Sequence, residues 1–116
     1  MGTRRITMLV ALMAVMMMAV FATAAYAATI TGTSANNELN ETNQADRIFG
    51  KGGKDVLDAS LYGHDVDKLW GGTGDDTLRA DDHDGADTLV GGEGYDACFG
   101  DPTDSFDISC DEVHAT

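Results

Sequence analysis

Single apolar residues recur along most of the chain at an interval close to nine. Each follows an aspartate or asparagine by two positions, and glycines are common just before that. In register, the chain divides into seven nonapeptide units and a degenerate eighth from Gly100: residues 32–40, 41–49, 50–58, 62–70, 71–79, 82–90 and 91–99. Position six reads Asn37, Asp46, Asp55, Asp67, Asp76, Asp87 and Asp96; position eight reads Leu39, Ile48, Leu57, Leu69, Leu78, Leu89 and Cys98. Such a repeat predicts a stack of similar units.

Each unit predicts a turn followed by a minimal strand. Glycines in the first six positions permit positive φ angles, so the backbone can turn with its carbonyls facing inward. Positions seven to nine form the strand, whose middle side chain alone points to the interior. Two units then complete one coil, with turns at opposite edges. The predicted fold class is all-β, a parallel β-roll, which is a two-sheet β-solenoid.

Stacking places chemically similar oxygens in columns. The position-six aspartates of units n and n+2 fall on the same edge, together with turn carbonyls. Carboxylate and carbonyl oxygens, without nitrogen or sulfur ligands, suit Ca²⁺, whereas Mg²⁺ needs a tighter octahedral shell. The repeat therefore predicts calcium as the partner of the turns.

The units resemble the repeats-in-toxin, or hemolysin-type calcium-binding, family, whose G-G-x-G-x-D-x-U-x nonapeptide forms a parallel β-roll. Residues 71–76 and 91–96 match its turn fully, and residues 50–55 match with Lys51 at the second glycine. The resemblance implies that turn carbonyls and position-six aspartates bind calcium jointly with the next turn on the same edge. The implied ligands are Asp55, Asp76 and Asp96, with carbonyls around Gly50, Gly52, Gly72, Gly74, Gly92 and Gly94.

The two edges differ in quality. Units one, three, five and seven form what we call the odd edge, which holds the glycine-rich turns and so predicts a competent calcium ladder. Neutral Asn37 weakens a site between units one and three. Units two, four and six form the even edge, which keeps its aspartates, lacks the glycine pattern and carries insertions at 59–61 and 80–81. Its aspartates are either weaker calcium ligands or solvated turn residues: Asp46, Asp67 and Asp87, helped by Asp65, Asp82 or Asp84.

The N-terminus has the order of a secretory signal peptide. Arg4 and Arg5 precede an apolar run from Ile6 to Phe21 and then small residues, so we expect a signal segment over 1–27 with cleavage after Ala27. A β-roll domain would occupy 28–116, and the protein would be secreted. The alternative is an uncleaved membrane anchor, the one way in which we expect contact with a membrane.

Charge strengthens the case for a cation. The chain has a net charge of −13, which argues against nucleic acid as a partner. Removing residues 1–27 leaves five basic and twenty acidic residues, a net charge of −15. Such a composition predicts disorder unless the carboxylates are neutralised, so we expect folding to depend on calcium.

The C-terminal segment is expected to close the roll. Cys98 and Cys110 are the only cysteines, and in an exported chain a disulfide is the default expectation. A bridge would fold the last strand back over the final coil, giving a disulfide-closed cap over about 98–112. Pro102 and the acidic Asp111 and Glu112 would discourage further strand pairing.

The sequence predicts no catalytic activity, because no separate domain exists to shape a substrate pocket around the adjacent carboxylates. The expected function is a secreted, calcium-folded structural or binding module. The alternative is an export and folding accessory, or a remnant, of a larger enzyme or toxin. An extracellular protein or polysaccharide partner would contact the even edge and Trp70, which lies with Phe49 at outward position nine.

Overall fold

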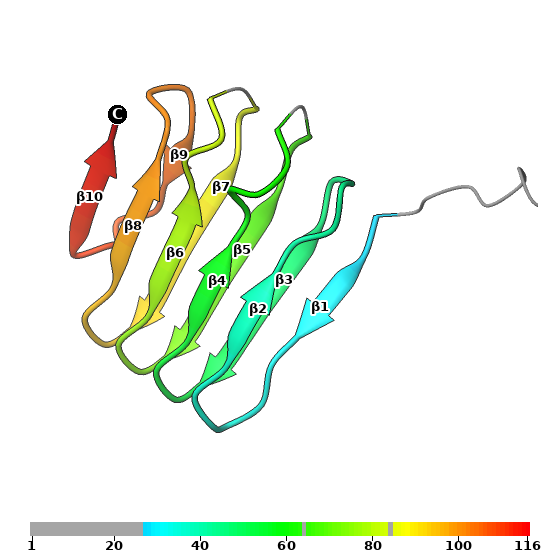
Figure 1. The fold of residues 1–116 in the computed structure, drawn as a ribbon. Helices are drawn as coiled ribbons and strands as arrows, with labels where there is room; N and C mark the ends of the chain where they lie inside the picture. The colour runs from blue at the N-terminus through cyan, green and yellow to red at the C-terminus, as the bar shows by residue number, and fades with distance from the viewer. Residues whose placement is uncertain (1–26, 64, 84) are drawn as a thin grey trace, which may run out of the picture.

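The computed structural model describes residues 27–63, 65–83 and 85–116, in which the chain forms ten strands in two parallel sheets (Figure 1). The strands alternate between the sheets along the chain. Sheet A contains β1 (Thr29–Thr31), β3 (Arg47–Gly52), β5 (Lys68–Thr73), β7 (Thr88–Glu93) and β9 (Ser105–Phe106). Sheet B contains β2 (Glu38–Asn40), β4 (Val56–Asp58), β6 (Thr77–Ala80), β8 (Ala97–Gly100) and β10 (Glu112–Ala115).

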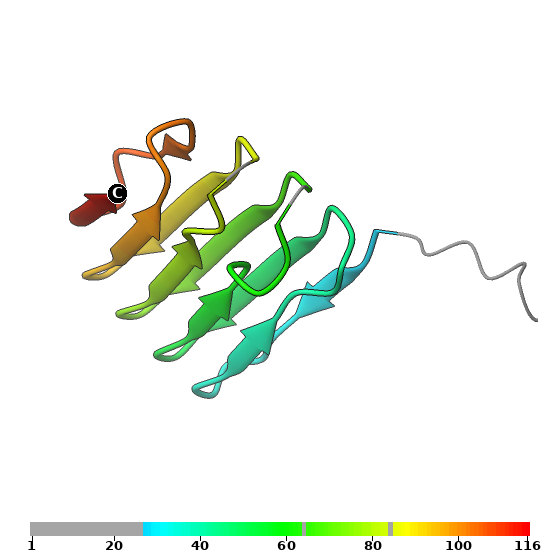
Figure 2. The ribbon, with the colours of Figure 1, turned by 45° about the horizontal axis from the view of Figure 1, so that its top comes forward.

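This topology is the predicted β-solenoid. Each coil uses one strand of sheet A and one of sheet B, and every neighbouring pair is parallel. In Figure 1 the short turns of the odd edge run along the bottom, and the longer loops of the even edge run along the top. Figure 2 brings the even edge forward and shows the two sheets lying face to face.

Position eight builds the core, as the alternation predicts. Ile48 pairs with Leu69 and Leu69 with Leu89 in sheet A, so equivalent side chains stack along the axis. The fully buried position-eight residues are Ile48, Leu57, Leu69, Leu78, Leu89 and Cys98. Leu39 belongs to the first coil and is only partly buried, since no further coil covers it on that side.

The insertions begin inside the solenoid. Ala59 and Ala80 follow directly after strand positions nine and are fully buried. The N–H of Ala59 donates to the carbonyl of Arg79 at 2.8 Å, so the ladder of sheet B continues for one more residue before the loop starts. The small side chain at this position fits the narrow interior of the even edge.

The C-terminus is closed by the predicted disulfide between Cys98 and Cys110. The expectation that the last strand folds back over the final coil is wrong. Instead β9 pairs parallel with β7 and β10 pairs parallel with β8, so the segment adds one more coil. Glu112 itself lies in β10, in register with Ala97, and β10 is the outermost strand of sheet B.

The predicted signal segment, residues 1–27, lies outside the described residues except for Ala27. Within the described part of the chain, no helix is long and apolar enough to cross a membrane.

Truncating one core side chain tests this architecture. In saturating calcium, Leu78→Ala should lower the free energy of unfolding by about 2–5 kcal/mol, because it leaves a cavity between stacked leucines. Urea denaturation followed by circular dichroism measures the change. The control is Ile108→Ala, at a side chain that is 100% exposed. Equal effects of the two substitutions would contradict the stacked core.

Candidate metal centre

The position-six side chains of the odd edge form one continuous hydrogen-bonded column. Each backbone N–H at position six donates to the position-six carboxylate of the next coil. The bonds run from Asn37 to Asp55 Oδ1 at 2.7 Å, from Asp55 to Asp76 Oδ1 at 2.8 Å and from Asp76 to Asp96 Oδ1 at 2.8 Å. Asp111 ends the column, with Oδ2 accepting from the N–H of Asp96 at 2.9 Å.

Only one oxygen of each carboxylate accepts these hydrogen bonds. Asp55, Asp76 and Asp96 are at most 2% exposed, yet Oδ2 of each accepts no hydrogen bond from any described residue. A buried carboxylate oxygen without a donor is costly. The predicted ligands therefore lie together on one edge, each with a free oxygen in the interior.

Close packing beside each free oxygen leaves room only for a glycine at position one. A Cβ on Gly71 would lie 2.5 Å from Asp76 Oδ2 and 2.5 Å from the carbonyl oxygen of Gly91. A Cβ on Gly91 would lie 2.5 Å from Asp96 Oδ2 and 2.8 Å from the carbonyl oxygen of Ser109. Gly50 faces Asp55 Oδ2 and the Gly71 carbonyl in the same way. At each of these glycines, a carboxylate oxygen therefore lies near a carbonyl oxygen of the next coil. Carboxylate and carbonyl oxygens together are a donor set that fits Ca²⁺.

Positions two and four carry the left-handed backbone of the turn. Their φ angles are 107° at Gly72 and 114° at Gly74, and the same positions in unit three are Lys51 at 78° and Gly53 at 89°. Gly52 instead pairs with Thr73. In unit three, Gly53 is therefore the equivalent of Gly74. The predicted carbonyl ligand, Gly52, lies one position before it. Gly92 and Gly94 repeat the left-handed pair, at 108° and 120°.

The first coil satisfies its own position-six side chains. Asn37 Oδ1 accepts from the N–H of Thr33 at 2.6 Å. Asp46 Oδ2, on the even edge, accepts from the N–H of Thr42 at 2.5 Å and from its hydroxyl at 2.8 Å. Threonine at position two therefore supplies the donors that these side chains need, which disfavours a cation at Asn37 or Asp46.

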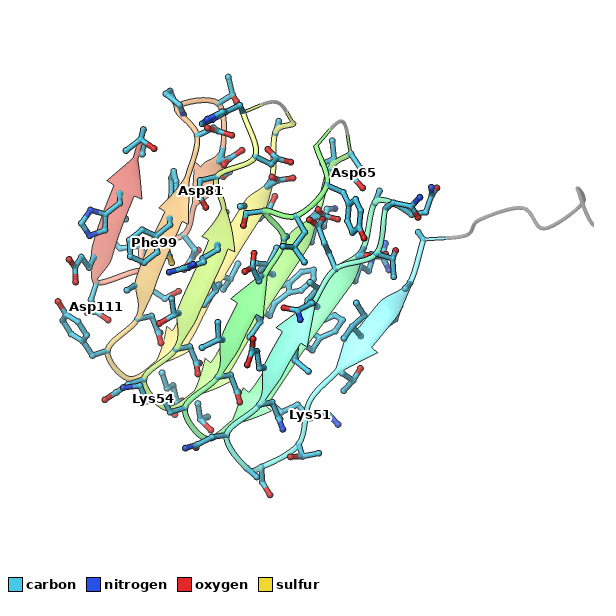
Figure 3. All side chains as sticks on the ribbon, viewed as in Figure 1. Lys51, Lys54, Asp65, Asp81, Phe99 and Asp111 are labelled. Atoms are coloured by element: carbon cyan, nitrogen blue, oxygen red, sulfur yellow. A yellow bond between two sulfur atoms is a disulfide. The ribbon has the colours of Figure 1, made fainter. Side chains whose placement is uncertain are left out.

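The even edge forms a second column. The N–H groups of Asp46, Asp67 and Asp87 donate to Asp67 Oδ1 at 2.6 Å, Asp87 Oδ1 at 2.6 Å and Asp104 Oδ1 at 2.9 Å. The interpretation of Asp46, Asp67 and Asp87 as solvated turn residues is wrong, because all three are at most 1% exposed. Asp84, named as a helper, lies outside the described residues. Figure 3 marks the two edges by Lys51 on the odd edge and Asp65 on the even edge.

Sequence reasoning missed Glu41, Asp104 and Asp111. The two aspartates end the columns, and a signal was available: Asp104-Ser105-Phe106 and Asp111-Glu112-Val113 repeat the spacing of Asp76-Thr77-Leu78. Shortened turns hid this spacing from a strict nine-residue register. Glu41 occupies position one of unit two, where the pattern calls for glycine.

Burial and neighbouring negative charges raise the pKa values of several of these carboxyl groups. Burial, reinforced by the charges of Asp96 and Asp55, raises the pKa of Asp76 to about 6. Burial also raises the pKa of Asp87 to about 7, with added repulsion from Asp104. Burial beside Asp67 raises the pKa of Glu41 to about 8. A bound cation would reverse this effect by favouring the ionised carboxylates.

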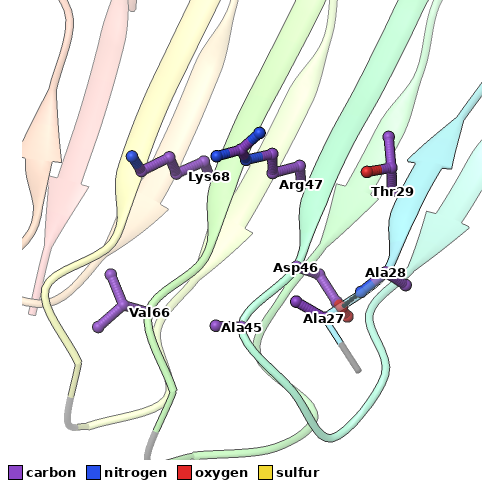
Figure 4. A pocket seen from close by; sticks show the side chains of 8 residues that line it. All are labelled: Ala27, Ala28, Thr29, Ala45, Asp46, Arg47, Val66 and Lys68. Atoms are coloured by element: carbon purple, nitrogen blue, oxygen red, sulfur yellow. Dashed lines mark hydrogen bonds between the residues drawn. The ribbon is translucent and has the colours of Figure 1, made fainter. Parts of the chain in front are cut away.

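A separate hollow of about 310 Å³ lies where the even edge meets sheet A (Figure 4). Arg47 and Lys68 extend beside each other from paired positions of β3 and β5. Further along these strands, Phe49 and Trp70 stack with ring centroids 4.5 Å apart. This face of sheet A therefore combines cationic and aromatic side chains in a strongly acidic protein.

The raised pKa values predict that the metal-free solenoid is more stable in mild acid than in mild base. An unfolded carboxyl group titrates near pH 4, whereas Asp76, Asp87 and Glu41 titrate at about 6, 7 and 8 when folded. The folded state thus binds more protons between these values, and stability falls as pH rises from about 4 to 8. Circular dichroism in chelator at pH 5 and at pH 8 measures how much β-structure the metal-free chain retains at each pH. Greater metal-free stability at pH 8 would contradict the burial of the columns.

The close packing at position one predicts that alanine is tolerated at one glycine of the repeat and not at another. Gly71→Ala should weaken calcium binding and lower stability, because its Cβ would collide with Asp76 Oδ2 and the Gly91 carbonyl. Gly52→Ala is the matched control, since the nearest atom to its Cβ is Thr73 Oγ1 at 3.3 Å. Calcium titration by calorimetry compares the two. Equal affinity in both variants would show that position one does not line a site.

The repeat sequence matches that of a known family. The family model described as RTX calcium-binding nonapeptide repeat (4 copies) matches residues 25–57 and 63–98, which is more than half of the chain. No curated protein and no solved structure gives a significant match. The matched residues include the Asp55, Asp76 and Asp96 column and the glycines that lie beside it. The chain therefore belongs to the RTX calcium-binding nonapeptide repeat family.

Proposed function

We propose that this protein is an exported, non-catalytic calcium-binding module in which Ca²⁺ bound along the odd edge drives folding of the β-solenoid. The observation that carries the proposal is the set of buried, unpartnered Oδ2 atoms of Asp55, Asp76 and Asp96. Each lies near a backbone carbonyl of the next coil, at a position where the packing admits only a glycine.

The proposed ligands combine these carboxylates with turn carbonyls. One site lies between units three and five, with Asp55 Oδ2 and the Gly71 carbonyl, and a second lies between units five and seven, with Asp76 Oδ2 and the Gly91 carbonyl. Carbonyls of the turn residues complete the shell: Gly72, Gly74, Gly92 and Gly94, with Gly50 and Gly53 in unit three. Asp96 Oδ2 and the Ser109 carbonyl form a third such pair in the last coil.

Calcium acts here as part of the folding energy. An unfolded chain holds no preformed site, so the free energy of binding adds to the free energy of folding. Without the ion, the column packs acidic side chains one above another in the interior, which like-charge repulsion and desolvation oppose. Bound calcium removes both penalties and joins successive coils.

Export is supported by the position of the expected cleavage point. The N–H of Ala28 donates to Asp46 Oδ1 at 2.7 Å. Cleavage after Ala27 would turn this amide into an ammonium group and the contact into an ion pair. The mature N-terminus would then neutralise the first carboxylate of the even edge.

We place contact with an extracellular protein or polysaccharide on the outer face of sheet A. The Phe49–Trp70 stack and the cationic pair of Arg47 and Lys68 support this choice. In a chain with a net charge of −13, a cationic and aromatic face suits an anionic sugar polymer.

A calcium titration of the purified protein tests the folding proposal. Circular dichroism should show little β-structure in chelator and full β-structure in calcium. Asp76→Asn should lower the apparent calcium affinity at least about tenfold, because the amide keeps the Oδ1 acceptor for Asp55 N–H and replaces the free oxygen.

The control is Asp81→Asn, which removes the same charge from an exposed position of the even edge. It should bind calcium like the unaltered protein. Identical β-structure with and without calcium would overturn the proposal, as would equal affinities in the two variants.

A further inference from the structure

Glu41 places an ionisable side chain at a position where the next two coils have alanine. Because Asn40 is in register with Asp58 and Asp58 with Arg79, Glu41 stacks above Ala59 and Ala80. Both alanines are fully buried, and Glu41 is only 6% exposed. A carboxylate thus replaces a methyl group at the interior of the even edge.

One oxygen of Glu41 is held by the inserted loop. Oε1 accepts from the N–H of Leu61 at 2.5 Å and from the N–H of Tyr62 at 2.6 Å. This leaves Oε2, which accepts no hydrogen bond from the described residues. The insertion at 59–61 therefore fixes the carboxylate without satisfying it.

A second buried carboxylate is oriented in the same manner. Asp67 is fully buried, and its Oδ1 accepts from the N–H of Asp46 at 2.6 Å. Its Oδ2, like Glu41 Oε2, has no donor among the described residues. Two anionic oxygens therefore face the same interior space from two successive coils.

Asp65 completes the group. Glu41, Asp65 and Asp67 each offer one oxygen, and these atoms lie within 4.8 Å of one another. Calcium holds its oxygen ligands at 2.3–2.6 Å, so ligands on opposite sides of the ion are about 4.6–5.2 Å apart. The spacing of the three carboxylates fits within such a shell.

We propose that Glu41, Asp65 and Asp67 bind a further divalent cation of the hard, oxygen-preferring class, Ca²⁺ above all, on the even edge. The site differs in composition from the odd-edge sites, because a glutamate side chain stands at position one and no glycine carbonyl is needed. The ion connects the first coil to the loop between β4 and β5 and neutralises a carboxylate in the core.

The competing arrangement is a single proton shared by Glu41 and Asp67. Burial raises the pKa of both groups; the neighbouring Asp67 adds to the effect at Glu41, whereas at Asp67 the added repulsion comes from Asp65 and Asp46 and the contact with Glu41 lowers the pKa. Glu41→Gln separates the two arrangements. It keeps an Oε1 acceptor for Leu61 and Tyr62, and its amide can donate to Asp67 as a shared proton would.

The experiment counts bound calcium by equilibrium dialysis of the purified protein. Glu41→Gln should lose one bound ion relative to the unaltered protein, while Glu38→Gln, on an exposed position of β2, should lose none. Hydrogen exchange of the Leu61 and Tyr62 amides should quicken in Glu41→Gln at saturating calcium. An unchanged ion count in Glu41→Gln would overturn the proposal, and more β-structure in chelator than the unaltered protein retains would then support the shared proton.

A second variant covers the case in which Glu41→Gln does not fold. Asp65→Asn changes a half-buried loop position and should lose the same ion. An unchanged ion count in Asp65→Asn would then overturn the site. The outcome is distinguishable from failure of the proposed function: the odd-edge proposal fails if Asp76→Asn leaves binding intact, whichever result Glu41→Gln gives.

Discussion

The hydrogen bond from each position-six N–H to the position-six carboxylate of the next coil is the interaction on which the rest of the solenoid depends. It fixes the register between coils at both edges, because Asp55 joins Asp76 just as Asp46 joins Asp67. It also forces the carboxylate into the interior, where its second oxygen has no donor among the described residues at Asp76 or Asp67. The contact that aligns the coils thereby creates the need for a positive charge.

The second oxygen of the position-six side chain has one of two environments in this chain. At Asn37 and Asp46 a threonine four residues earlier donates to the side chain from its backbone. At Asp55, Asp76 and Asp96 position two is Lys51, Gly72 or Gly92 with a positive φ angle, and one carboxylate oxygen is left without a donor among the described residues. The difference between a self-satisfied turn and a turn with a free oxygen thus follows from the residue at position two and its backbone conformation.

The sequence was sufficient to predict the two sheets, the stacked leucines and the Cys98–Cys110 disulfide, because each follows from a strict period or from the presence of two cysteines. It was less informative where the period slips. In unit three, the sequence G-K-G-G can be aligned with the repeat in two ways, so the alignment selected Gly52 in place of Gly53. The shortened last turns break the nine-residue register and so hid Asp104 and Asp111. The burial of the even-edge aspartates could not be inferred, because their backbone partners lie about twenty residues away and glycine content was the wrong guide to it.

Glu41 escaped prediction for a related reason. At position one it looked like a lost glycine, whereas in the solenoid that position faces the interior and lies beside the next coil's loop. Deviations from a repeat are usually read as decay of the repeated function. Here the deviation coincides with an insertion whose first residue, Ala59, stays in the core while Leu61 and Tyr62 turn their N–H groups toward Glu41. The two departures lie in successive coils of the even edge and meet in space, so they act together as one structural feature.

The two ends of the solenoid are held by contacts between protein groups. Stability in such a stack is a sum of each coil and its interfaces with its neighbours. The first coil satisfies its position-six side chains through Thr33 and Thr42, and the last coil is tied to the preceding one by the Cys98–Cys110 disulfide. Neither end relies wholly on a cation for its order. In the coils between them, the position-six carboxylates of Asp55, Asp67, Asp76 and Asp87 each accept an N–H from the preceding coil and keep one buried oxygen without a donor among the described residues. The proposed odd-edge calcium would therefore act mainly on the middle of the stack.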